Sequence, residues 1–131
     1  MLAKLIFLSF AMAAVAKPKV ASSDVQMNWE QAAAYCSSSN QSMLTYAYAG
    51  QKSYTARNNK PLWLGIRRCP TNNARWIDQK RVDVTEAIAQ RFEPGQPDNS
   101  SGDENCLVII ANSKLLKDIP CGAAVAFAGC S

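Results

Sequence analysis

Histidine is absent from all 131 residues of this chain. Without histidine the chain can form neither a Ser–His–Asp nor a Cys–His nucleophile pair, and it cannot form an HExxH zinc site. Long apolar runs are also lacking downstream of the N-terminus, because the stretches at 106–111 and 123–128 have only the length of strands. A helix that spans a bilayer needs about 20 apolar residues, so we predict no membrane insertion.

A large excess of charge of one sign is lacking as well. Lysine and arginine number 14 and the acidic residues 10, which gives a formal net charge of +4 at pH 7. The positive charges are spread along the chain, for example at Arg57, Arg67, Arg68, Arg75 and Arg81. Such a spread is typical of a solvated surface, so we predict no nucleic-acid partner.

The N-terminal segment has the pattern of a secretory signal peptide. Lys4 precedes an uncharged apolar run at 5–15, and Ala14 and Ala16 form the small-x-small pattern of a cleavage site. We predict a signal peptide over 1–16, secretion to the extracellular space, and a single domain over 17–131. A domain of this size can bury one core.

Five cysteines in a short secreted chain predict a disulfide framework with one thiol left over. They are Cys36, Cys69, Cys106, Cys121 and Cys130. Their spacing alone leaves the connectivity open. The absence of histidine and of any CxxC pair argues against a zinc site.

A helix is predicted near the start of the mature chain. Asn28 and Gln31 have the spacing of a capping box at its N-terminus. Apolar residues follow at the spacing of one helical face, namely Trp29, Ala32, Ala33 and Cys36. We expect the helix to end within 37–40, and the preceding residues 17–25 to form a polar lead-in.

The strand candidates come later in the chain, at 62–66, 75–78, 106–111 and 123–130. Residues 86–91 fit either a helical turn or an extended segment, and residues 117–120 lie between the last two strands. Residues 93–104 are rich in turn formers and carboxylates, which predicts a loop. A helix first and strands late is an α+β pattern.

These segments, in this order, resemble a C-type lectin-like domain of the short, Gln-Pro-Asp type. The resemblance runs from residue 29 to the end of the chain and is carried by WEQAAAYC at 29–36, WLGI at 63–66, PGQPDNSSGDENC at 94–106 and KDIPC at 117–121. It implies an early helix, small antiparallel sheets and a long binding loop. It also implies two disulfides that staple the fold, Cys36–Cys130 and Cys106–Cys121, and leaves Cys69 unpaired. Cys69 is then either a free thiol or the bridge of a covalent homodimer.

The resemblance also implies a calcium site made by Gln96, Asp98, Glu104 and Asp118, with a cis peptide bond before Pro97. Oxygen donors of this kind are the ligands that Ca²⁺ prefers. In the family, two vicinal sugar hydroxyls complete the calcium shell, and a Gln-Pro-Asp motif accompanies galactose-type ligands. We therefore expect a calcium-dependent lectin for galactose or N-acetylgalactosamine, acting in glycan recognition or innate defence, and no enzyme.

Lys117 departs from this pattern, because it stands where the family has an asparagine ligand. It removes a carbonyl oxygen and brings a positive charge towards the metal position, so calcium affinity should fall. Alternatively, Lys117 pairs with Asp98 or Glu104 and replaces calcium, in which case it joins the sugar-binding residues of a metal-independent site. The rival function is a protein-binding or ice-binding scaffold with a degenerate sugar site.

Two N-glycosylation sequons begin at Asn40 and Asn99. A glycan on Asn99 would lie beside the binding loop. Residues 99–102 offer no aromatic ring for the apolar face of a sugar, which is a second departure from many sugar sites.

Overall fold

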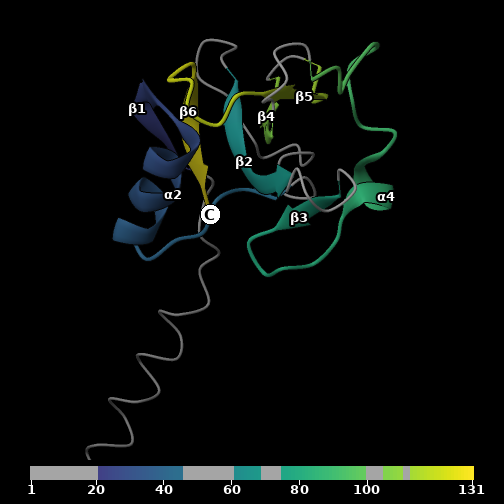
Figure 1. Cartoon of the computed structure of the whole chain (residues 1–131). Helices are drawn as coiled ribbons and strands as arrows, with labels where there is room; N and C mark the ends of the chain where they lie inside the picture. The colour runs from purple at the N-terminus through teal and green to yellow at the C-terminus, as the bar shows by residue number, and fades with distance from the viewer. Residues whose placement is uncertain (1–20, 46–60, 69–74, 100–104, 111–112) are drawn as a thin grey trace, which may run out of the picture.

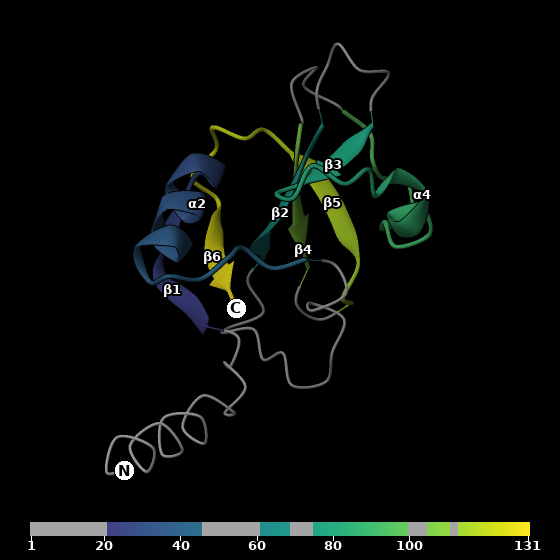
Figure 2. The ribbon, with the colours of Figure 1, turned by 90° about the horizontal axis from the view of Figure 1, so that it is seen from below.

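The computed structural model describes residues 21–45, 61–68, 75–99, 105–110 and 113–131 (Figure 1). These residues form an α+β fold, as predicted. In chain order the elements are β1 (Ala21–Met27), α2 (Trp29–Ser38), β2 (Leu62–Arg68), β3 (Trp76–Asp78), α4 (Thr85–Ile88), β4 (Cys106–Ile109), β5 (Leu116–Ile119) and β6 (Ala126–Cys130). Helices α2 and α4 lie at opposite ends of the fold in both views (Figures 1 and 2).

Helix α2 forms as the capping box predicts. The Asn28 side chain accepts the N–H of Gln31, and the Gln31 side chain accepts the N–H of Asn28. The buried residues of the helix are Trp29, Ala32 and Cys36, which share one face at positions i, i+3 and i+7. This face packs on the sheet beside β1 and β6 (Figure 1).

The described strands form one mixed sheet in the order β1-β6-β2-β4-β5. Strand β4 pairs along one edge of β2. The other edge is shared, because β6 pairs with Leu62 and Trp63 while β3 pairs with residues 66–68. The β2–β6 pairing is parallel, and the other pairings are antiparallel. The expectation of small antiparallel sheets is thereby corrected to a single mixed sheet.

The two faces of this sheet carry two hydrophobic clusters. Leu62, Leu64 and Ile66 of β2 belong to one cluster, and Trp63 belongs to the other, which includes the buried face of α2. Strand β4 alternates in the same way. Both central strands are therefore buried on both faces, which explains why they appear in the sequence as short unbroken apolar runs.

Several element boundaries differ from the sequence-based expectations. A strand, β1, precedes the helix where we expected a lead-in, because its backbone pairs with the C-terminal strand β6. Residues 116–119 form β5 rather than a connection, since they pair with β4. The open choice at 86–91 is resolved as a short helix at Thr85–Ile88. The last strand begins at Ala126 and not at 123.

The structure has both disulfides that the family resemblance implied. One joins Cys36 of α2 to Cys130 of β6, and the other joins Cys106 of β4 to Cys121. Cys69 and the predicted signal peptide at 1–16 lie outside the described residues. Within the described ranges, every helix is too short or too polar to cross a bilayer.

Candidate functional site

The candidate binding loop leaves α4 and runs along the outer strand β5. The N–H of Glu93 donates to the carbonyl of Leu116, and the N–H of Gln96 donates to the carbonyl of Glu93. Gly95 has a φ of +85°, a conformation that a residue without Cβ adopts easily. The Gln96–Pro97 peptide bond is cis, as the family resemblance implied.

This loop brings the side chains of Gln96 and Asp98 together. Gln96 Nε2 donates a hydrogen bond of 3.1 Å to Asp98 Oδ2. Gln96 Oε1 is buried and has no hydrogen-bond partner among the described residues. A buried polar oxygen without a partner is unusual in a native protein, because its desolvation is not compensated.

Asp118 ties the same loop to the sheet. Its side chain is completely buried on β5. Oδ1 accepts the backbone N–H of Asp98 at 3.1 Å, and Oδ2 accepts that of Asn99 at 2.9 Å. One carboxylate therefore fixes two successive peptide groups of the loop.

Arg68 contacts this carboxylate with its guanidinium. Its Nη2 lies 3.6 Å from Asp118 Oδ2, and only 10% of the Arg68 side chain is exposed. Arg68 Nε donates to Asn105 Oδ1 at 3.3 Å, and the guanidinium lies over the ring of Trp76, 4.7 Å from its centroid. These contacts hold the guanidinium against β3, β5 and the residue that precedes β4.

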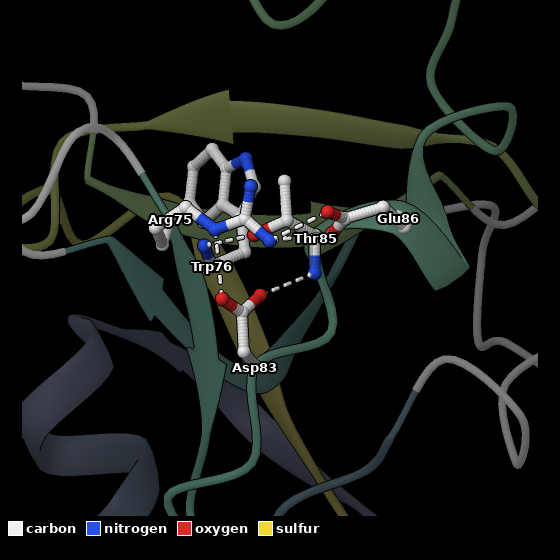
Figure 3. Close-up of polar contacts among 5 residues, drawn as sticks. All are labelled: Arg75, Trp76, Asp83, Thr85 and Glu86. Atoms are coloured by element: carbon white, nitrogen blue, oxygen red, sulfur yellow. Dashed lines mark hydrogen bonds and ion pairs between the residues drawn. The ribbon is translucent and has the colours of Figure 1, made fainter.

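Trp76 is held in turn by the polar cluster of Figure 3. Its backbone N–H donates to Thr85 Oγ1 at 2.7 Å. Arg75 donates to Asp83 at 2.7 Å and to both oxygens of Glu86 at 2.6 and 2.7 Å. The hydrogen bonds from Arg75 lower the pKa of Asp83 to about 2 and also lower the pKa of Glu86. This cluster clamps β3 to the start of α4.

Lys117 lies on the other face of the sheet from Asp118. In the register of β4 with β5, Lys117 pairs with Val108 and Asp118 pairs with Leu107. Directly paired residues share a face, and neighbouring residues on a strand do not. In the described part of the chain no ion pair joins Lys117 to Asp98.

The predicted site residues are thus partly assembled. Gln96, Asp98 and Asp118 lie together, whereas Glu104 falls outside the described residues. No group of three or more His, Cys, Asp or Glu residues able to hold a metal occurs within the described ranges. Asn99, the start of one sequon, is exposed on this loop. Asn40, the start of the other, is exposed just after α2.

A separate hollow of about 190 Å³ lies away from this loop. It is lined by Trp29, Gly65, Arg67, Ile77, Asp78 and Gln79. The Arg67 guanidinium lies over Trp29 there and pairs with Glu30 at 3.1 Å. Arg67 and Arg68 therefore point to opposite faces of β2 and have different partners.

Sequence reasoning missed Arg68 and Asn105 as residues of the site. In the sequence, Arg68 is recognisable only as one of the positive charges spread along the chain. Strand alternation places it on the same face as Ile66, which was a usable signal. Its partner Asp118 is 50 residues away in the chain, and no local pattern pairs the two.

Comparison with known proteins identifies the fold. A family model described as the C-type lectin domain matches residues 25–128. TC14, a C-type lectin from the tunicate Polyandrocarpa misakiensis, is 21% identical with a TM-score of 0.67, over 85% of this chain and 94% of TC14. No curated protein matches the chain significantly.

Two further solved structures are similar to this chain. The carbohydrate-recognition domain of cow CD23, crystallised in the presence of a GlcNAc2Man3 oligosaccharide, is 20% identical with a TM-score of 0.66, over 87% of this chain and 88% of that one. A calcium-independent type II antifreeze protein is 20% identical with a TM-score of 0.64, over 88% of each chain. At these identities the similarity establishes the fold alone.

Proposed function

The chain belongs to the C-type lectin domain family, and on that premise we propose that it is a carbohydrate-binding lectin whose sugar site is the loop at 96–99. Binding without catalysis suits this loop. Its carboxylates are engaged with an amide and with backbone N–H groups, and no nucleophile lies in contact with them among the described residues.

The observation that carries the proposal is the pairing of Gln96 with Asp98. The buried Oε1 of Gln96 lacks a partner in the described part of the chain, and a carboxylate oxygen lies next to the same amide. Oxygens of this kind fit a hard divalent cation. We propose that Gln96, Asp98, Glu104 and Asp118 hold Ca²⁺. When bound, the ion would offer open coordination positions to two vicinal hydroxyls of a sugar.

The order of amide and acid favours a galactose-type ligand. A carboxylate only accepts hydrogen bonds, whereas an amide also donates them. Gln96 and Asp98 therefore offer a donor and acceptor pattern that is the reverse of a Glu-Pro-Asn loop, and the family associates this order with galactose or N-acetylgalactosamine.

A glycan array with and without a chelator tests the proposal. We expect wild type to bind galactose-type glycans in calcium and to lose them in the chelator. The double variant Gln96→Glu with Asp98→Asn should shift the preference towards mannose-type glycans. The pair Gln90→Glu with Asp24→Asn makes the same chemical changes at two exposed positions outside residues 96–99 and should leave the preference unchanged. Failure to bind any glycan with or without calcium would contradict the proposal.

A second candidate is a metal-independent protein-binding or ice-binding scaffold. The contact of Arg68 with Asp118 favours it, since a cation of the protein itself already lies at one of the proposed calcium ligands. The similar antifreeze protein is described as calcium-independent. Thermal hysteresis of the purified domain, together with an empty glycan array, would favour this candidate over the lectin.

We further propose that residues 1–16 are a cleaved signal peptide and that the protein is secreted. N-terminal sequencing of the mature protein should begin at Lys17. Cys69 is proposed as either a free thiol or the bridge of a homodimer. Non-reducing electrophoresis distinguishes the two, because only the bridge produces a dimer band that the reductant removes.

A further inference from the structure

We propose that Arg68 is a positioning residue of the candidate site, the built-in counter-cation of Asp118 that keeps the loop at 98–99 ordered without a metal. The inference rests on the proposed function only for the choice of site. On this proposal Arg68, in place of a bound cation, compensates the charge of Asp118.

The burial of Asp118 is the first step of the argument. A carboxylate that is completely buried needs a compensating charge or hydrogen bonds, because its desolvation is costly. The described structure gives it both, with the guanidinium at 3.6 Å and two backbone N–H groups at 2.9 and 3.1 Å. The charge on Arg68 therefore offsets part of the cost of burying the carboxylate to which the loop N–H groups donate.

The fixed orientation of Arg68 is the second step. Asn105 accepts from its Nε, and the carbonyl of Asn105 accepts from its backbone N–H at 2.8 Å. The guanidinium carbon of Arg68 also lies over the ring of Trp76. Because the side chain is nine-tenths buried and held on two sides, little conformational freedom remains to be lost on pairing with Asp118.

The neighbouring arginine supplies an internal comparison. Arg67 also lies over a tryptophan, Trp29, at 4.8 Å, and also contacts a carboxylate, that of Glu30. However, the side chains of Arg67 and Glu30 are 50% and 69% exposed. The two arginines thus share strand, chemistry and ring contact, and differ in whether the carboxylate is buried and bound to the loop.

Backbone amide hydrogen exchange, followed by NMR in excess chelator and without sugar, tests the inference. In wild type we expect the amides of Asp98 and Asn99 to be protected. Arg68→Gln should reduce that protection by at least about tenfold, because the buried carboxylate that binds both amides loses its counter-charge. Arg67→Gln should leave both amides as in wild type. Arg68→Lys, which keeps the charge and loses the planar fork, should retain part of the protection.

Calcium affinity distinguishes the proposed role of Arg68 from a merely structural one. Removing the guanidinium removes a positive charge next to a proposed ligand, so Arg68→Gln should bind calcium at least about tenfold more tightly than wild type in calorimetry. A general loss of structure would weaken binding instead. Arg67→Gln should match wild type.

Three results would overturn the inference. They are rapid exchange of both amides in wild type without calcium, equal protection in Arg68→Gln and Arg67→Gln, and calcium affinity that falls in Arg68→Gln. If Arg68→Gln does not fold, Arg68→Lys is compared with Arg67→Lys, and equal exchange in these two overturns it. An empty glycan array with protected amides would remove the proposed function and leave the role of Arg68 intact.

Discussion

Replacement of Asp118 by alanine measures how strongly one carboxylate stabilises the fold. This side chain is fully buried, accepts two backbone N–H groups and contacts a guanidinium. Removing one partner of a buried ion pair costs about 3–5 kcal/mol. Each hydrogen bond to a charged group contributes about 1.5–3 kcal/mol. Both figures describe the loss of the same carboxylate, so they are not added, and we expect a loss of about 3–5 kcal/mol.

Urea unfolding followed by tryptophan fluorescence, with the disulfides intact, measures this free energy. Asp83→Ala is the matched control. Asp83 also pairs with an arginine, Arg75, and also accepts a backbone N–H, that of Thr85, but it lies on the surface. Solvent screens exposed pairs, so the control should lose much less. Equal losses in the two variants would refute the claim that burial of Asp118 decides its contribution.

A double variant separates the free energy of the Arg68–Asp118 ion pair from the general effect of removing the Asp118 side chain. Asp118→Leu alone leaves the guanidinium of Arg68 buried without its carboxylate. Adding Arg68→Met should recover part of the loss, because replacing both partners with apolar groups removes the uncompensated charge. The coupling free energy should lie within about 0.5–3 kcal/mol, as for residues in contact. Strict additivity of the two changes would contradict the contact.

Three further predictions follow from other parts of the fold. In the folded protein Arg75 holds the pKa of Asp83 at about 2, below its ordinary value of 3.8. The pair therefore stabilises the fold fully at a pH above 3.8, and this stabilisation is lost as the pH falls from 3.8 to about 2. The Tm difference between wild type and Asp83→Asn should therefore shrink over that range, and a constant difference would contradict it. Gly129→Ala should lose about 1–3 kcal/mol in urea unfolding by overpacking, since its Cβ would lie 2.5 Å from Leu44 Cδ1, whereas Gly122→Ala has open space and should be nearly neutral. Replacing both cysteines of the α2–β6 disulfide, which are 94 residues apart, should lower the free energy of unfolding by about 4–5 kcal/mol. Replacing those of the other disulfide, which are 15 residues apart, should lower it by about 3 kcal/mol, and the reverse order of urea midpoints would contradict this.

Local patterns in the sequence predicted the elements whose causes are local. The capping box of Asn28 with Gln31 starts α2, and the apolar run at 62–66 forms the centre of β2. The two disulfides followed from the family resemblance, because spacing alone left the pairing open.

The elements that sequence reasoning missed depend on partners far away in the chain. Strand β1 has exposed Asp24, Val25 and Gln26 and shows no regular apolar alternation. It is extended because its backbone pairs with β6, 99 to 109 residues later in the chain. The buried Ser23 hydroxyl also accepts the N–H of Ala128. No propensity of its own residues predicts this pairing.

The candidate site shows the same division. The family resemblance implied that Gln96 and Asp98 lie side by side across a cis peptide bond, and the structure has them in contact. The family resemblance implied that Lys117 and Asp118 both face the site, whereas strand pairing places them on opposite faces of the sheet. Adjacency in sequence predicts proximity in a loop but opposite orientation in a strand.

The loop is therefore supported by a chain of contacts that begins outside it. Arg75, Asp83 and Glu86 fix β3 against α4, Trp76 of β3 carries the guanidinium of Arg68, and that guanidinium compensates the buried Asp118. Asp118 then holds the two peptide N–H groups next to the proposed ligand oxygens. Ordering a loop on binding costs free energy, and a loop that the scaffold already holds avoids most of that cost. On this proposal Arg68 affects both the order of the loop and the metal affinity of the site. It compensates the charge of Asp118, which orders the loop, and it repels a cation bound there. We expect the repulsion to outweigh the saving in ordering cost, so that changing Arg68 should move loop order and metal affinity in opposite directions.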